Sequence, residues 1–131
     1  MDNPELLIVD DEPVNIQVLS AVLKDRYRIR FAVSGEQALA MVQDHPPDLI
    51  LLDIMMPDMS GIELCKLLKA KPATQSVPIL FVTSNQEREV EVEGLSVGAM
   101  DFIYKPIRPH LVRARVANYL ELKSARDQLA G

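Results

Sequence analysis

The sequence predicts an α/β fold in which a parallel sheet carries helices on both faces. Short apolar segments alternate along the chain with segments whose apolar residues recur at helical spacing, five of each kind. The apolar run 49–52 is unbroken, which is typical of a strand buried on both faces. Polar residues directly follow the apolar segments, and sheets of this kind bind ligands at the carboxyl ends of their strands.

Composition and charge exclude several classes of protein. With 131 residues, the chain is long enough for one domain with a substantial core. A formal net charge of -5 argues against direct nucleic-acid binding, and the single cysteine, Cys65, excludes an intramolecular disulfide and a zinc site built from several thiolates. No apolar segment approaches the roughly 20 residues of a membrane-spanning helix, and the N-terminus lacks the features of a signal peptide. We therefore expect a cytoplasmic protein without membrane contact.

The first strand and the first helix are predicted near the N-terminus. Residues 6–9 form an apolar run that ends in Asp10 and Asp11. Pro13 suits the first position of the following helix, with an acidic cap just before it. We expect this helix to end near residues 24–25.

An edge strand, a second helix and the central strand follow. Residues 28–33 alternate partly in polarity, as a strand near the edge of a sheet does. The segment 35–44 has the apolar spacing of a helix, and the Pro46-Pro47 pair ends it. The run 49–52 is then the central strand, and it stops at Asp53.

The second half of the chain predicts two further strands. A third helix begins after the Ser60-Gly61 pair, and the fourth strand covers residues 77–82 and ends at Thr83. The last strand covers residues 101–104 and is stopped by Lys105-Pro106. The last helix starts near residues 108–109 and continues to about Leu129, without glycine or proline inside it.

The segment 87–97 is compatible with two interpretations. Val90 and Val92 alternate with glutamates as in a strand, whereas Val90, Gly94 and Val97 permit a helix. We choose the helix, because a crossover between parallel strands is needed at this point.

Five polar residues are predicted to converge at one edge of the sheet. Parallel strands place their carboxyl ends on the same edge, so residues far apart in the sequence meet there; they are Asp10, Asp11, Asp53, Thr83 and Lys105. Clustered carboxylates repel one another unless a cation is bound, and oxygen ligands of this kind suit Mg²⁺. A lysine and a hydroxyl beside the metal complete a site for a phosphoryl group, and the central Asp53 is the candidate nucleophile.

This set resembles the receiver domain of two-component response regulators, a CheY-like family. The resemblance covers roughly residues 5–120. The motifs that carry it are Asp10-Asp11, Asp53-Ile54-Met55-Met56-Pro57 with Gly61, Thr83, and Lys105-Pro106, each after a predicted strand. It implies a flavodoxin-like, doubly wound sheet of five strands in the order 2-1-3-4-5.

The resemblance also implies a role for each residue at the metal and phosphoryl site. Asp53 matches the phosphoacceptor, Asp11 a direct Mg²⁺ ligand and Asp10 the second acidic residue. The backbone carbonyl of Met55 matches the third protein ligand of the metal, and Lys105 matches the lysine that pairs with the phosphate.

Two further features follow from the same resemblance. Thr83 matches the switch hydroxyl, and Phe102, rather than Tyr104, matches the switch aromatic residue. A cis peptide bond is expected between Lys105 and Pro106.

The implied function is a phosphorylation switch, not an enzyme that turns over external substrates. A sensor histidine kinase or a phosphotransfer protein would supply the phosphoryl group. Phosphorylation would then bias the face formed by the fourth helix, the fifth strand and the fifth helix, through which the chain could form a homodimer.

The C-terminal residues add an expectation about domain organisation. Residues 1–120 are predicted to form the receiver domain and residues 121–131 to extend its last helix. Leu122, Ala125 and Leu129 follow the spacing of a dimeric coiled coil, and the last helix resembles those of receivers that feed an output module for cyclic di-GMP. A standalone receiver and a receiver cut from a longer protein both stay open.

Other interpretations are possible for single residues and for the whole set. Asp10, Asp11 and Glu12 could simply cap a helix, and Asp53 could form a turn. Thr83 could be a cap, and Lys105 could be a solvated strand end. A phosphatase of the haloacid dehalogenase type also uses a strand-end Asp with Thr, Lys and Mg²⁺, but it needs a second Asp where this chain has Met55. A receiver-like binding module that never carries phosphate is the other alternative.

Overall fold

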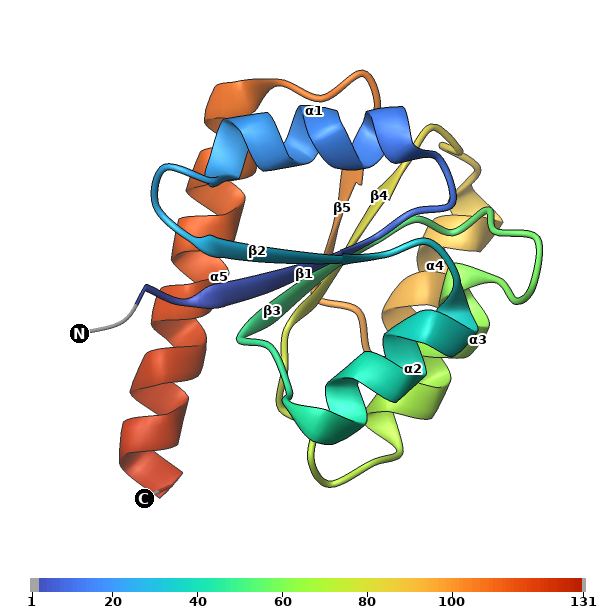
Figure 1. Cartoon of the computed structure of the whole chain (residues 1–131). Helices are drawn as coiled ribbons and strands as arrows, with labels where there is room; N and C mark the ends of the chain where they lie inside the picture. The colour runs from blue at the N-terminus through green and yellow to red at the C-terminus, as the bar shows by residue number, and fades with distance from the viewer. Residues whose placement is uncertain (1–2, 131) are drawn as a thin grey trace.

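The computed structural model describes residues 3–130 and has the predicted α/β architecture (Figure 1). Strands and helices alternate along the chain. The strands are β1 (Glu5–Val9), β2 (Arg28–Ala32), β3 (Leu49–Leu52), β4 (Ile79–Thr83) and β5 (Asp101–Tyr104). The helices are α1 (Pro13–Leu23), α2 (Gly35–Asp44), α3 (Gly61–Lys69), α4 (Arg88–Ser96) and α5 (Pro109–Ala130).

All five strands are parallel, and their order in the sheet is β2-β1-β3-β4-β5. This confirms the flavodoxin-like order 2-1-3-4-5. The chain moves from β1 outward to β2 and then returns to the other side of β1 with β3. Ligands of open α/β sheets bind where the strand order reverses in this way, so the fold itself points to the carboxyl ends of β1 and β3.

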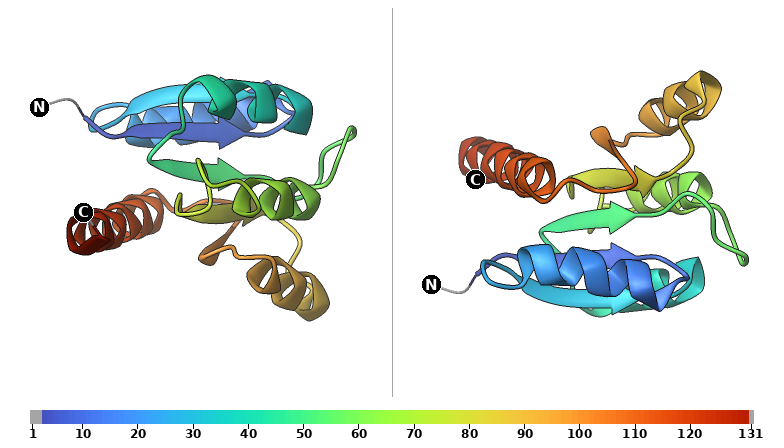
Figure 2. Two further views of the ribbon diagram at one scale, coloured as in Figure 1. Left: turned by 90° about the horizontal axis from the view of Figure 1, so that it is seen from below. Right: turned by 90° about the horizontal axis from the view of Figure 1, so that it is seen from above.

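Helices cover both faces of the sheet (Figures 1 and 2). Leu6 and Ile8 of β1 pack with α1 and α5, whereas Leu7 and Val9 pack with α2 and α3 on the opposite face. Successive side chains of a strand point to opposite faces, so a strand covered on both sides must be apolar throughout. The same alternation in β3 explains the unbroken run Leu49–Leu52, which is completely buried.

The structure shifts some predicted boundaries by one or two residues. α1 ends at Leu23, slightly before the expected residues 24–25, and β4 begins at Ile79 rather than at Val77. Val77 belongs to the preceding turn, because its N–H donates to the carbonyl of Thr74 at 3.0 Å. β2 is an edge strand, as predicted.

Two helices begin with a serine cap. The hydroxyls of Ser34 and Ser60 accept backbone N–H groups of the first turns of α2 and α3. Pro13 stands at the start of α1, but the expected acidic cap is absent as a side-chain contact: Glu12 occupies the N-cap position and makes no side-chain hydrogen bond there.

The last helix continues well past the sheet (Figure 1). Val112 and Val116 are fully buried in the core, whereas Leu122 and Leu129 are 58% and 91% exposed. The expected cis bond between Lys105 and Pro106 is present just before this helix. Within residues 3–130, no helix is both long enough and apolar enough to cross a membrane.

Candidate functional site at the carboxyl ends of the strands

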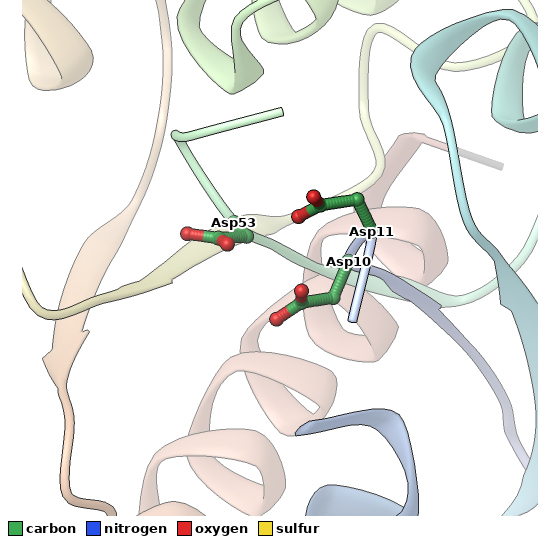
Figure 3. Close-up of side chains that lie close together, drawn as sticks. All are labelled: Asp10, Asp11 and Asp53. Atoms are coloured by element: carbon green, nitrogen blue, oxygen red, sulfur yellow. The ribbon is translucent and has the colours of Figure 1, made fainter. Parts of the chain in front are cut away.

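Three carboxylates meet where β1 and β3 end. Asp10 follows β1 and Asp53 follows β3, and the last residues of these paired strands, Val9 and Leu52, lie opposite each other. Asp10, Asp11 and Asp53 each offer a carboxylate oxygen within 4.8 Å of the others. In Figure 3 the three side chains lie together with their carboxylates directed to the same side. The predicted acidic cluster is therefore present.

The backbone fixes the two innermost carboxylates. The N–H of Asp53 donates to the carbonyl of Val9 at 2.9 Å, so β1 holds the start of the turn that follows β3. Asp10 is only 2% exposed and Asp53 8%. One oxygen of Asp10, Oδ1, accepts the N–H of Glu12 at 3.0 Å, which leaves Oδ2 for other partners. Asp10 therefore stabilises the turn into α1 as well as contributing to the cluster.

Lys105 brings a positive charge to the cluster from the end of β5. Its Nζ donates to Oδ2 of Asp10 at 3.1 Å and lies 3.7 Å from Oδ2 of Asp53. The N–H of Lys105 also donates to the carbonyl of Thr83 at 3.0 Å, which ties this residue to the end of β4. Lys105 is thus in contact with three of the other residues predicted to converge, Asp10, Asp53 and Thr83.

Thr83 ends β4 at the same edge of the sheet and is buried. Its hydroxyl accepts the N–H of Asn85 at 3.2 Å, the bond of a residue that stabilises a turn. Thr83 therefore has a structural role in the turn that follows β4. The hydroxyl retains its proton for a second bond, as donor to an incoming oxygen.

The turn after β3 is held very close to Asp53. The N–H of Gly61 donates to the carbonyl of Ile54 at 2.8 Å. A Cβ atom at Gly61 would lie 2.1 Å from the backbone oxygen of Asp53, so only glycine fits. Met55, whose carbonyl is the predicted metal ligand, lies in this turn, and its N–H donates to Oδ1 of Asp53 at 3.4 Å.

The charge of Asp53 is destabilised by its surroundings. Burial raises the pKa of Asp53 above its usual value, and the neighbouring Asp10 acts in the same direction. Lys105 and the backbone N–H groups of Ile54 and Met55 lower the pKa and offset only part of this effect. A cation at the cluster would relieve the repulsion between the carboxylates, and the all-oxygen donor set matches Mg²⁺.

The two aromatic residues of β5 differ in their surroundings. Phe102 is 7% exposed, and its ring centroid lies 5.2 Å from that of Phe81. Tyr104 is partly exposed, and its hydroxyl donates to the carboxylate of Glu91 in α4. The predicted switch residue, Phe102, thus points into the core between the sheet and α4.

Two contacts near the site could not be predicted from the sequence. The carboxylate of Asp58 accepts the N–H groups of Gly35 and Glu36 at 3.2 and 3.1 Å, which joins the turn after Asp53 to the start of α2. The bond between Tyr104 and Glu91 joins β5 to α4. A lone acidic residue in a loop or a helix gives no sign of its partner in the sequence, whereas the strand-end residues could be found from the topology.

Comparison with known proteins identifies relatives over nearly the whole chain. A family model described as the response regulator receiver domain matches residues 6–117. A probable cyclic di-GMP phosphodiesterase from Vibrio cholerae is 42% identical over 95% of this chain, and the response regulator PleD from Caulobacter vibrioides is 39% identical over 95%. The chain spans only 28% of the length of each of these two relatives.

Solved structures agree with the curated relatives. A putative response regulator from Chloroflexus aurantiacus superposes with a TM-score of 0.88 at 35% identity, covering 92% of this chain and 99% of that one. The chemotaxis protein CheY4 of Vibrio cholerae superposes with a TM-score of 0.85 at 31% identity, covering 89% of this chain and 98% of that one.

Proposed function

Because the chain belongs to the response regulator receiver domain family, we propose that it is a phosphorylation switch whose phosphoacceptor is Asp53. The observation that carries the proposal is the cluster of Asp10, Asp11 and Asp53 with Lys105 beside it. Asp53 is the central member, since it follows the middle strand of the sheet and lies between the other two aspartates and Lys105 in the strand order.

The acidic cluster fits a bound Mg²⁺. Three carboxylates within 4.8 Å of one another supply the hard oxygen ligands that this ion prefers, and the surplus negative charge favours a cation. Asp10, Asp11, Asp53 and the backbone carbonyl of Met55 would hold it. When bound, the ion offsets the negative charge on the oxygens of the phosphoryl group.

Asp53 acts as the nucleophile in the proposed reaction. One of its carboxylate oxygens attacks the phosphorus of a phosphohistidine or a small acyl phosphate, and a new bond from oxygen to phosphorus forms. The bond to the donor breaks, and its electron pair leaves with the histidine nitrogen or the carboxylate of the donor. Lys105, 3.7 Å from Oδ2 of Asp53, pairs with the phosphoryl oxygens, and the hydroxyl of Thr83 donates to one of them.

The phosphoryl group biases a two-state equilibrium. Thr83 turns to the phosphoryl group only when that group is present, and Phe102 occupies its inward position in the same state. The new contacts are the only source of free energy for the shift, so the face of α4, β5 and α5 changes by as much as those contacts favour one state.

The partners follow from the phosphorylation chemistry and from the lengths of the relatives. A sensor histidine kinase or a phosphotransfer protein donates the phosphoryl group, and we place the domain in the cytoplasm with the kinase. One relative that contains this domain is named a probable cyclic di-GMP phosphodiesterase, so we propose an output module of that kind for the full-length protein. Residues 121–131 would then form a helical linker after the receiver domain of residues 1–120, and this helix or the face of α4, β5 and α5 would form a homodimer.

The alternatives have no comparable support. A haloacid dehalogenase-like phosphatase requires an acid two residues after the nucleophile, and Met55 cannot transfer a proton. A binding module that never carries phosphate would have no need for Lys105 within reach of two carboxylates.

Incubation with acetyl phosphate and Mg²⁺ tests the proposal. Intact mass measurement should show one added phosphoryl group in the wild-type protein and none in Asp53→Asn or in the presence of a chelator. Asp58→Asn is the matched control, because this aspartate lies in the same turn as Met55 but its carboxylate accepts hydrogen bonds from the start of α2. Labelling that persists in Asp53→Asn would refute the assignment.

A further inference from the structure

The helix α4 buries one residue completely in its contact with the sheet. Gly94 is that residue, Val90 packs half-buried against the core, and Val92 and Leu95 are exposed. A glycine in the interior of a helix destabilises the helix relative to alanine. Since α4 nevertheless contains this glycine at its one buried position, the contact made there has to be specific.

Gly94 lies directly over two aromatic rings. A Cβ atom at this position would lie 2.6 Å from Cζ of Phe102 and 2.9 Å from Cε2 of Phe81. Both distances are below any normal contact between carbon atoms. The missing side chain therefore leaves the space that the edge of the Phe102 ring occupies.

A second contact joins the same helix to the same strand. The hydroxyl of Tyr104 donates to the carboxylate of Glu91, which stands three residues before Gly94 on α4. Phe102 and Tyr104 are two residues apart in β5 and so share one face of the sheet, with their ring centroids 5.9 Å apart. One apolar and one polar contact thus join α4 to β5 at adjacent points.

We propose that Gly94 and Glu91 form a seat for β5 that holds Phe102 in its inward position and couples the placement of α4 to the phosphorylation site. This inference rests on the proposed function for the link to Asp53, but the seat itself is a property of the fold. Tyr104 lies opposite Thr83 in the sheet register, so the polar fastening is beside the predicted switch hydroxyl. Any movement of α4 away from β5 opens the space around Phe102.

The first experiment replaces Gly94 by alanine and observes the phenylalanine rings. The chain has three phenylalanines, so 4-fluorophenylalanine gives three ¹⁹F resonances, and Phe102→Leu assigns the one of interest. In the wild-type protein only exposed Phe31 should respond to a soluble paramagnetic agent, since Phe81 and Phe102 are buried. In Gly94→Ala, the Phe102 resonance should broaden as well, or the amide protons of α4 should exchange faster.

A matched control separates the seat from a general effect on the helix. Val92 is an exposed residue of α4, and Val92→Ala should leave the Phe102 resonance unchanged. Gly94→Ala should lower the denaturation midpoint strongly in the wild-type background and much less in the Phe102→Ala background, where only the contact with Phe81 is left. If Gly94→Ala raises stability in both backgrounds and leaves Phe102 and α4 protected, the seat does not exist.

The coupling to phosphorylation has its own measurement. Beryllofluoride with Mg²⁺ mimics the phosphoryl group, and Gly94→Ala should bind it about tenfold more weakly than the wild-type protein, within the usual range of coupling between two sites. Equal affinity, with Phe102 displaced, would refute the coupling and leave the seat. Failure of the wild-type protein to bind beryllofluoride would refute the proposed function, and the ¹⁹F measurement would still decide whether the seat exists.

Discussion

Asp53 stands at the end of a completely buried strand, and its surroundings favour the uncharged form of its carboxyl group. Burial and the charge of Asp10 raise its pKa, and Lys105 offsets only part of this. A site that destabilises its own nucleophilic charge gains stability when a cation or a phosphoryl group with its cation arrives. The charge of Asp53 therefore lowers the stability of the metal-free protein and favours the binding of a cation.

Asp53→Asn should stabilise the metal-free protein at pH 7. The pKa of Asp53 is higher in the folded than in the unfolded state, so its contribution to stability is complete below the ordinary value of 3.8 and is lost as the pH rises through the folded value. At pH 7 the asparagine removes this penalty, and the free energy of unfolding should increase on the order of 1 kcal/mol. Urea denaturation at pH 7 and at pH 4.5 measures the difference, which should shrink at the lower pH.

The opposite sign is expected at Asp58, which provides the control. Backbone N–H groups at the start of α2 lower the pKa of Asp58, so its charge stabilises the fold above its unfolded pKa. Asp58→Asn should therefore lower the denaturation midpoint at pH 7. Mg²⁺ should raise the midpoint of the wild-type protein and have a smaller effect on Asp53→Asn; equal or lower stability of Asp53→Asn without metal would contradict the argument.

Cys65 should be unreactive in the folded protein. Burial raises the pKa of its thiol to about 11, and the reactive species is the thiolate. Ellman's reagent at pH 8 should modify Cys65 only at the rate at which the protein opens, and at once in concentrated urea. Rapid modification without denaturant would show that α3 leaves the sheet easily.

Among single residues, the sequence predicts the location of those that the sheet topology brings to the site. Asp10, Asp53 and Lys105 each follow an apolar run, and the parallel sheet then brings them together. The partners of Asp58 and Glu91 are not predictable in this way, because their contacts depend on side-chain direction and on the path of single turns.

Among the elements, the turn between β3 and α3 determines how precisely Asp53 is placed. Gly61, the first residue of α3, lies so close to Asp53 that an added Cβ atom would be 2.1 Å from the backbone oxygen of Asp53. Backbone atoms in a buried turn cannot move aside at low cost. The turn and the strand end are therefore one rigid unit.

Gly61→Ala should destabilise the protein by about 2 kcal/mol or more and slow phosphorylation by acetyl phosphate. Its control is Gly35→Ala, where a new Cβ atom meets only the flexible side chain of Met59. Denaturation midpoints and labelling rates of both variants should differ clearly, with Gly35→Ala closer to the wild-type protein. If the two variants behave alike, the close approach at Gly61 does not constrain the site.

The helices and strands also differ in how well apolar patterns in the sequence predict them. β1, β3 and β4 are unbroken apolar runs, and they are found where the sequence predicts them, with small shifts at the ends. The segment 87–97 is compatible with a strand and with a helix, because the one buried residue of α4 is a glycine. Val90 and Val97 pack only partly buried against the core, so the apolar stripe of this helix is short and weak.

On the scale of the whole molecule, the sheet order places the site and brings the strand that leads to it under α4. The reversal between β1 and β3 creates the crevice; β5 carries the aromatic residues under α4, and Lys105 directly follows it. This order follows from the resemblance to receiver domains and is confirmed. The outer half of α5 leaves Leu122 and Leu129 exposed, and the guanidinium of Arg126 joins it to the domain by donating to the carbonyl of Ser76.

The exposed side of α5 has the pattern of a two-stranded coiled coil. Leu122 and Leu129 are seven residues apart and Ala125 lies between them, so all three fall on one stripe. In a parallel pair with the leucines at position a, Glu121 occupies position g and Arg126 the following position e. Residues at these two positions form ion pairs between the helices, and the charges here are opposite.

A dimer through α5 should therefore depend on the leucine stripe. Replacing Leu122 and Leu129 together by glutamate puts like charges into the seam, so the variant should be monomeric under conditions in which the wild-type protein dimerises. Ser124→Glu, an exposed substitution off the stripe, is the control and should leave the dimer intact. Sedimentation equilibrium with and without beryllofluoride and Mg²⁺ measures the mass; a wild-type protein that is monomeric in both states would show that the stripe has another use.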